Sequence, residues 1–380
     1  MSMDSIFELE YNVNELKKDD EKSYKLFNRI YSFYSDFGTL KILPPMKPLF
    51  LGYFGERDDS GQLTSKLEDV FENLEKQKII NIFNEWTGQG TLYNSLRSKR
   101  PGMNRDLSEK RIKLQHLIKN SEENCDFCSP EKNTPEDVFG RVRGKNSITA
   151  ANIAKYDVWS SLVIFKNHNP LEFNLEELSD YLDTSFKWFD MVFNEDENYK
   201  YPFFVWNCLP RAGASQIHGH AQILMTKGRS YARVESLKKT ILKYKIETKA
   251  NYLNDLYKVH KSLGLSYKSG DVRLFASITP VKEKEIIIIS PGPPSKLDQT
   301  KKVIFNILRC LIDVLGVQSF NMSISCPSMN EDDDIPYIIK IVDRGDISKS
   351  TADIGGMELF GSTVVADDPY NVIKKLRECL

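Results

Sequence analysis

The apolar positions of the chain repeat with two periods, which predict different elements along its length. Apolar residues recur every three or four positions among charged residues in 22–34 and 66–86, a spacing typical of amphipathic helices. We therefore expect residues 1–90 to form a helical N-terminal region. Further along, short β-rich runs predict strands and a longer amphipathic run predicts a helix between the first two of them: strands 159–165, 202–207 and 216–225, and helix 175–192.

The last third of the chain repeats this order of strand, helix, strand and strand. The repeat is predicted at 285–290, 295–315, 319–326 and 337–343. No histidine follows His260, so the second copy would lack the chemistry of the first. We expect an α+β protein of two related units with antiparallel sheets and packed helices, at 91–230 and 231–380, after the N-terminal region.

Composition excludes several classes of function. The 380 residues carry 52 Lys and Arg against 53 Asp and Glu, so no global basic field is available to bind a nucleic-acid backbone. No window approaches the roughly 18 uninterrupted apolar residues of a membrane span, and the polar, acidic start does not resemble a signal peptide. We expect a cytoplasmic protein without nucleic-acid or membrane partners.

The most informative segment is 213–222, in which a Gly-Ala-Ser loop precedes Gln-Ile-His-Gly-His-Ala-Gln. Alternate side chains of a strand share a face, so His218, His220 and Gln222 are expected to point one way. A single strand histidine is more often structural, but three polar groups in register are costly to bury without a purpose. We interpret this face as a chemical site.

The segment resembles the Ser-x-x-His-x-His-x-Gln signature of the galactose-1-phosphate uridylyltransferase branch of the histidine-triad superfamily. The resemblance implies that His220 attacks the α-phosphorus of a nucleotide and carries the nucleoside monophosphate covalently. A backbone carbonyl would hold its second ring nitrogen. Ser215 and Gln222 match family residues that hydrogen-bond the phosphoryl oxygens. The unit at 91–230 would then be catalytic and the unit at 231–380 a degenerate copy.

The family also has a zinc site, whose ligands match Cys125, Cys128, His168 and His218. The Cys-x-x-Cys pair alone is equally compatible with a redox pair or two surface thiols. Two thiolates and two imidazoles, however, form a closed tetrahedral zinc complex, as expected of a structural site. The remaining histidines, His116 and His260, lie in charged, helical sequence and are expected at the surface.

Four further residues extend the resemblance. Arg97 and Arg100 lie in a segment similar to the family's Arg-Ala-Lys-Arg-Pro, whose arginines bind substrate phosphates; otherwise they belong to a solvated basic face. Asn152 matches an asparagine near the nucleoside. Asn207 matches one upstream of the glycine loop, and would otherwise be a strand-end residue that caps a turn.

The chain also departs from the family pattern. The second metal site of true uridylyltransferases, one glutamate and three histidines, cannot be assembled here, and their hexose-binding motif is absent. The resemblance therefore favours a nucleotidyltransferase or phosphorylase that moves a nucleoside monophosphate from a nucleoside-diphosphate sugar or dinucleoside polyphosphate to phosphate or a sugar phosphate. A true galactose-1-phosphate uridylyltransferase, a hydrolase of the superfamily and a non-catalytic nucleotide-binding protein stay open, as does a homodimer.

Overall fold

A computed structural model describes residues 4–55, 62–64, 66–99, 107–330, 335–348 and 354–380. Its packing divides the chain into two units, each assembled from separated segments. The first unit holds Met1–Asp106, Ile278–Glu283 and Ile354–Asn371, and the second holds Leu107–Ser277, Lys284–Asp353 and Val372–Leu380. The domain boundaries predicted from the sequence, at residues 90 and 230, differ from the limits of these packing units and stay a prediction.

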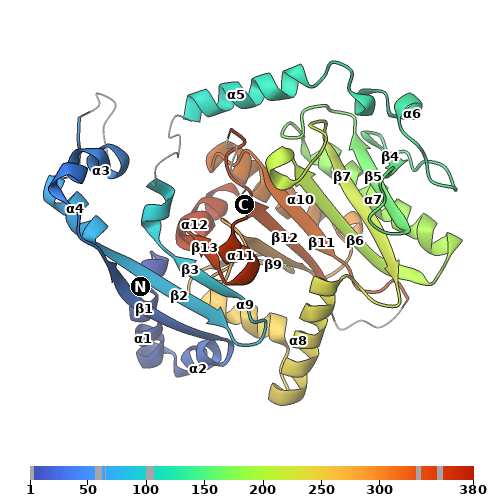
Figure 1. Ribbon diagram of the computed structural model, residues 1–380. Helices are drawn as coiled ribbons and strands as arrows, with labels where there is room; N and C mark the ends of the chain where they lie inside the picture. The colour runs from blue at the N-terminus through green and yellow to red at the C-terminus, as the bar shows by residue number, and fades with distance from the viewer. Residues whose placement is uncertain (1–3, 56–61, 65, 100–106, 331–334, 349–353) are drawn as a thin grey trace. The chain divides into compact units, whose positions relative to one another are not determined.

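The first unit is built on a four-stranded sheet in the order β1-β2-β3-β13 (Figure 1). The first three strands are antiparallel, and β13 joins β3 in parallel. The strands are β1 (Tyr31–Thr39), β2 (Lys76–Asn84), β3 (Gly90–Tyr93) and β13 (Thr363–Val365), and the helices are α1 (Leu9–Asp19), α2 (Glu21–Ile30), α3 (Lys47–Phe54), α4 (Leu67–Glu75) and α11 (Gly356–Phe360).

Both helices predicted in this unit end earlier than expected. The helix predicted over 22–34 ends at Ile30 and passes directly into β1, and the helix predicted over 66–86 ends at Glu75 and passes into β2. Along β2 the buried side chains alternate, at Ile80, Ile82 and Asn84. This is the period of a strand, so the N-terminal region contains a sheet beside its helices.

The second unit contains a nine-stranded sheet in the order β4-β5-β7-β6-β11-β12-β10-β9-β8, with every neighbouring pair antiparallel. Its strands are β4 (Ser147–Ala151), β5 (Trp159–Phe165), β6 (Tyr199–Cys208), β7 (His220–Lys227), β8 (Ser266–Ser269), β9 (Val272–Ala276), β10 (Ile286–Ser290), β11 (Phe320–Ser325) and β12 (Tyr337–Asp343). Its helices are α5 (Leu107–Asn120), α6 (Pro130–Asn133), α7 (Leu175–Glu195), α8 (Ala232–Thr248), α9 (Tyr252–Ser262), α10 (Asp298–Arg309) and α12 (Pro369–Cys379), the last of which begins in the first unit.

The order of the large sheet confirms the predicted pair of related units. Read outward from the central pair β6–β11, one side runs β6, β7, β5, β4 and the other runs β11, β12, β10, β9. Helix α7 lies between β5 and β6 in the chain, and α10 lies between β10 and β11 in the same place. β5 and β12 have the predicted bounds, and the overall class is α+β as expected.

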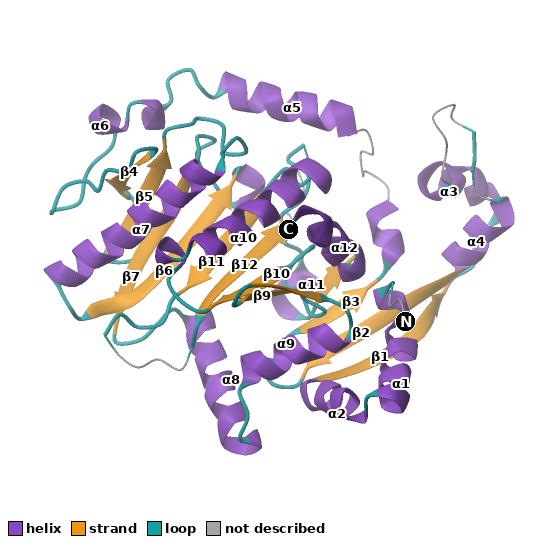
Figure 2. Ribbon diagram, turned by 180° about the vertical axis from the view of Figure 1, so that it is seen from behind, coloured by secondary structure: helices purple, strands orange, loops and turns teal. Residues whose placement is uncertain are grey.

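The core of this unit lies on one face of the sheet. Helix α7, which begins with a capping box of Asn174 and Glu177, packs on β4 to β7, with α10 beside it (Figure 2). Phe165 stacks on Tyr181 at 3.7 Å between ring centroids, and the fully buried Trp206 packs edge-on against Phe165. On the other face, the centre of the sheet is half-exposed. We call this the open face and define it by Phe203, Val205 and Asn207 of β6 and their partners Ser325, Ser323 and Asn321 of β11.

Two isolated histidines were expected at the surface, and one of them is not. His116 is exposed on α5, as predicted. His260 is fully buried on α9, where its Nδ1 lies 2.8 Å from the Leu256 carbonyl oxygen and its ring lies 4.1 Å from the ring centroid of Phe275. The apolar side of α9 is wide enough to include this position, which the charged neighbours in the sequence conceal. Among the described helices, none is long and apolar enough to cross a membrane.

The burial of His260 makes stability depend on pH. Burial lowers the pKa of His260 from 6.5 to about 4, so below pH 6.5 the unfolded chain binds a proton that the folded chain does not. The free energy of unfolding should fall by about 2 kcal/mol between pH 7.5 and pH 5 on account of this residue. Urea unfolding at both pH values checks this: in His260→Phe the acid loss should shrink by that amount, whereas an equal loss in both proteins would contradict it.

Candidate functional site

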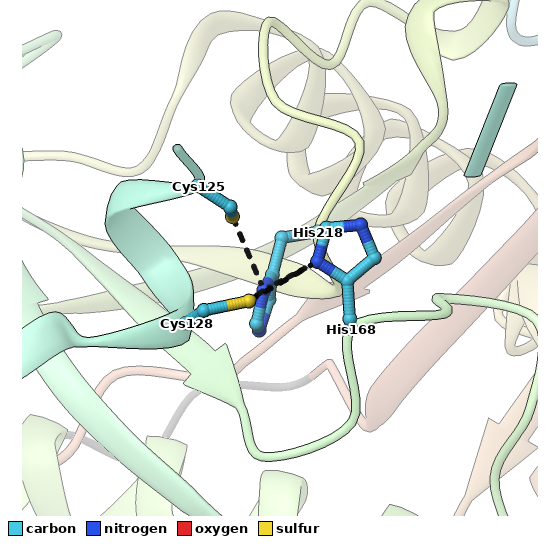
Figure 3. A group of neighbouring side chains, drawn as sticks. All are labelled: Cys125, Cys128, His168 and His218. Atoms are coloured by element: carbon cyan, nitrogen blue, oxygen red, sulfur yellow. Dashed lines mark hydrogen bonds between the residues drawn. The ribbon is translucent and has the colours of Figure 1, made fainter. Parts of the chain in front are cut away.

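Four side chains of the second unit converge in a metal-binding arrangement (Figure 3). Cys125 precedes a short turn, Asp126–Cys128, that ends at Cys128 and brings the two thiols to one side; His168 follows β5, and His218 precedes β7. Their ligand atoms all lie within 4.8 Å of one another. The sequence prediction named these four residues, and the fold brings all of them together.

Four of the distances between ligand atoms in the cluster are close to those around a tetrahedral zinc ion. Zn–S and Zn–N bonds of ordinary length place sulfur about 3.6 Å from nitrogen, and nitrogen about 3.3 Å from nitrogen. The Nδ1 of His218 lies 3.5 Å from the Sγ of Cys125 and 3.4 Å from that of Cys128. The Nδ1 of His168 lies 3.3 Å from the Sγ of Cys128 and 3.1 Å from the Nδ1 of His218.

The protons of the two imidazole rings point to the same conclusion. The Nε2 of His218 lies 2.8 Å from the Phe165 carbonyl oxygen, which can only accept, so this nitrogen is the protonated one. The Nε2 of His168 lies 2.9 Å from the hydroxyl of Ser121, which donates its own proton to the Ile118 carbonyl and therefore accepts from the ring. With each Nε2 assigned as a donor, the Nδ1 atoms of His168 and His218 both face the cluster 3.1 Å apart, an arrangement that a cation between them would stabilise.

Burial shifts the pKa values of two groups in the cluster. Burial raises the pKa of the Cys128 thiol to about 11, with a further contribution from Cys125, and burial lowers the pKa of His218 to about 4. The protein alone thus keeps both groups neutral, and a bound cation would release the thiol proton. Two thiolates and two neutral imidazoles are the donor set of a closed structural zinc site.

Ser121 is a member of this site that the sequence did not reveal, because a lone serine four residues before Cys125 carries no motif. Its hydroxyl fixes which nitrogen of His168 faces the cluster. Ser121→Ala should weaken zinc binding by about 10- to 100-fold, the usual effect of losing a partner of a ligating histidine. Competition with a chromophoric chelator measures this affinity. The exposed neighbour Ser129 is the matched control, and equal affinities of Ser121→Ala and Ser129→Ala would contradict the role.

His220 is the first residue of β7 and is 5% exposed. Its Nδ1 lies 2.8 Å from the carbonyl oxygen of His218, so Nδ1 carries the proton and Nε2 carries the lone pair. Burial lowers the pKa of His220, which keeps the ring neutral near pH 7. The orientation by a backbone carbonyl is the one that the resemblance implied for a nucleophile, although the role itself stays a prediction.

A single aromatic side chain joins the metal cluster to this histidine. Phe127 lies between the two cysteines in sequence, and its ring packs edge-on against His218 at 6.0 Å and against His220 at 5.2 Å. Gly219 is required between the two histidines, because a Cβ there would come within 2.7 Å of the Phe165 ring. Because Phe127 contacts His220, a displacement of the cysteine loop would move the Phe127 ring relative to His220.

The strand that presents these residues starts later than predicted. Residues 215–219 form a loop with bends at 215, 217 and 218, so His218 lies outside β7 and turns toward the cysteines, while His220 and Gln222 occupy alternate positions of the strand. Gln222 pairs with Val205 and so continues the open face onto β7. It is 7% exposed, its Nε2 lies 3.5 Å from the Tyr156 hydroxyl, and its Oε1 is buried with no partner in the described structure.

The other predicted site residues are distributed over both units. In the second unit, Ser215 is exposed in the bend before His218, Asn207 is half-buried on the open face, and Asn152 is half-buried directly after β4. In the first unit, Arg97 is exposed in the short turn Ser95–Lys99. Arg100 lies outside the described residues. The substrate contacts of these residues stay predictions.

A cavity of about 420 Å³ opens beside the cluster. Ile148 and Ile164 form part of its wall, and Ile164 pairs with His220, so the cavity lies on the same side of the sheet as that histidine. Phe127 adds an aromatic ring, and three lysines line the cavity as well: Lys132, Lys145 and Lys166. An apolar wall with cationic groups suits a ligand that combines a ring with a phosphate.

Comparison with known proteins places the fold. No family model and no curated protein matches the chain. Among solved structures, an ADP-glucose phosphorylase from Arabidopsis thaliana with bound ADP-glucose has a TM-score of 0.58 at 17% identity, over 77% of this chain and 96% of that one. A GalT-like protein from Arabidopsis thaliana has a TM-score of 0.55 at 19% identity, over 68% and 93%. A uridylyltransferase has a TM-score of 0.52 at 15% identity, over 80% and 99%. The chain therefore has the fold of the galactose-1-phosphate uridylyltransferase-like nucleotidyltransferases and phosphorylases, as its histidine motif predicted.

Proposed function

We propose that the chain transfers a nucleoside monophosphate in two steps through a covalent intermediate on His220. The observation that carries this proposal is the state of that ring, which is buried, neutral and held through Nδ1 by the His218 carbonyl. A histidine fixed in this way has one nitrogen free for attack and cannot adopt the other tautomer. The shared fold supports the assignment, since the similar structures include a phosphorylase and a uridylyltransferase.

The bond changes follow from this geometry. In the first step the Nε2 lone pair of His220 attacks the α-phosphorus, and the bond from that phosphorus to the bridging oxygen breaks. The leaving group, which is a sugar phosphate or a nucleoside polyphosphate, departs with the electron pair of that bond. The Nδ1 proton stays on the ring, where the His218 carbonyl stabilises the positive charge of the phosphorylated imidazole. In the second step an acceptor oxygen attacks the same phosphorus, the N–P bond breaks, and its electron pair returns to Nε2.

Three polar residues are proposed to bind the phosphoryl oxygens while charge redistributes around phosphorus. Gln222 lies two residues along the same strand, Asn207 lies on the neighbouring strand, and Ser215 lies in the loop before His218. We assign the metal cluster a structural role, since a zinc ion bound there would cross-link the cysteine loop to the start of β7 and leave no open position for a reactant. Phe127 would transmit that constraint to the His220 ring.

The proposed donor is a nucleoside-diphosphate sugar or a dinucleoside polyphosphate, and the proposed acceptor is phosphate or a sugar phosphate. The first similar structure holds ADP-glucose in a phosphorylase, which favours a nucleotide sugar and phosphate. β12, the counterpart of β7 in the second repeat, runs Tyr337–Asp343 and contains no histidine, so we assign the reaction to the first repeat only.

A direct test uses α-labelled ADP-glucose, UDP-glucose, UDP-galactose and diadenosine tetraphosphate, each with and without phosphate. Intact mass should show one nucleoside monophosphate attached to the chain with the correct donor, and added phosphate should discharge it. Turnover that ignores phosphate and sugar phosphates would favour hydrolysis. If no donor gives an adduct or turnover, the proposal is wrong.

A further inference from the structure

The side-chain amide of Asn207 is held by two residues of the histidine-free repeat. Asn321 of β11 pairs with Asn207 across the centre of the sheet, and its Nδ2 lies 2.7 Å from the Oδ1 of Asn207 and 2.9 Å from the Ala212 carbonyl oxygen. Arg344, which follows β12, donates from Nη1 to the Oδ1 of Asn321. Neither Asn321 nor Arg344 stands in a recognisable motif of the sequence.

These contacts fix the direction of each hydrogen bond that Asn321 makes with Arg344, Asn207 and Ala212. A guanidinium only donates, so the atom of Asn321 that faces Arg344 must be its carbonyl oxygen. The amide nitrogen of Asn321 then faces Asn207 and Ala212, and the acceptor that it meets on Asn207 must be oxygen. The Nδ2 of Asn207 is therefore turned away from Asn321, and no described residue accepts a hydrogen bond from it.

The same register brings the Asn207 amide next to the candidate nucleophile. Val205 pairs with Gln222; Asn207 lies two residues beyond Val205, and His220 lies two residues before Gln222. Alternate residues share a face, so Asn207 and His220 occupy neighbouring strands on the same side of the sheet, which are about 5 Å apart. An amide donor at that distance can reach an oxygen of a phosphoryl group on Nε2.

We propose that Asn321 and Arg344 are positioning residues, which orient Asn207 so that its Nδ2 donates to the transferred phosphoryl group. This inference rests on the proposed function of His220. The histidine-free repeat is the second repeat, β9 to β12 (residues 272–343). This proposal gives that repeat a part in the reaction, although it contributes no reacting group. The second bond of Asn321, to the Ala212 carbonyl oxygen, helps to fix the orientation of the Asn321 amide.

Asn321→Asp is the sharpest test, because it changes one NH₂ group to oxygen and keeps the contact with Arg344. The Asp carboxylate cannot donate, so the amide of Asn207 should rotate and present its oxygen to the phosphoryl group. We expect nucleotidylation of His220 to slow by about 100-fold, the usual effect of losing one preorganised donor. Asn207→Ala should cause a similar loss. In the Asn207→Ala background, Asn321→Asp and Arg344→Met should cause almost no further loss.

Two further measurements separate this proposal from its alternatives. Ser325→Asp adds the same charge to the same face of β11, four residues away, and should leave the rate nearly unchanged. The same double-mutant cycle on the affinity of the matching nucleoside monophosphate gives a readout that needs no turnover. Additive losses in both cycles would overturn the positioning role and leave the proposed function intact. Non-additive binding without any adduct would support the positioning role and contradict the proposed function. A wild-type chain that binds no nucleotide contradicts both.

Discussion

His220→Asn is expected to abolish the nucleotidyl adduct and to reduce turnover by about 10⁴-fold or more, because a carboxamide nitrogen has no free lone pair with which to attack phosphorus. The carboxamide is close to the imidazole in size and polarity, so the strand and the neighbouring metal cluster should be preserved. Pre-steady-state mixing with the active donor, followed by intact mass, measures the adduct directly. Steady-state assays measure the remaining turnover.

Two further variants test whether this result is specific to His220. His116→Asn replaces an exposed histidine of α5 and should retain full activity. His220→Gly leaves space for a free imidazole, which should restore part of the turnover when added to the assay, since it supplies the missing nucleophile. An adduct of unchanged stoichiometry on His220→Asn would show that a different residue carries the nucleotide, and the proposed mechanism would be wrong.

Loss of the metal cluster should have the second largest effect. Cys125→Ser removes one thiolate from a site whose remaining ligands are Cys128, His168 and His218, and metal analysis should show a loss of about one zinc per chain. Because a structural zinc contributes directly to folding, we expect the melting temperature to fall by roughly 10 °C, as follows from a loss of about 4 kcal/mol in a unit of this size. Activity should also fall, through the contact between Phe127 and His220.

Cys379→Ser is the control for this experiment, because Cys379 lies outside the cluster and is only partly buried. It should keep both the zinc content and the melting temperature. Inductively coupled plasma mass spectrometry and differential scanning calorimetry measure the two quantities on the same samples. Unchanged zinc in Cys125→Ser would remove the four-ligand assignment, whatever the effect on stability.

The parts of the molecule that could be predicted from the sequence depend on local patterns. The bounds of β5 follow from a continuous β-rich run, and the four residues of the metal-binding cluster were predicted from their resemblance to the zinc site of the family. The order of the second repeat follows from the same alternation of strand and helix signals. In each case the residues that carry the signal lie close together in sequence or belong to a known motif.

The parts that could not be predicted depend on contacts between distant segments. β2 follows α4 without a turn signal, so a helical spacing that continued across the junction concealed the change of period. His260 is buried because of what packs on α9, which its charged neighbours do not reveal. Ser121 and Asn321 act through hydrogen bonds to partners 47 and 114 residues away. Such bonds leave no trace in the pattern of apolar and polar positions.

The pairing of β6 with β11 has a consequence for the integrity of the chain. Within its own repeat each of these strands is an edge strand. On the side away from its own repeat, β6 pairs with β11. If the chain were cut between β7 and α8, each half would expose a row of unsatisfied backbone N–H and C=O groups, which is a template for aggregation. The histidine-free repeat therefore shields the strand of Asn207 from solvent and from other chains, and its removal would leave the first repeat prone to self-association.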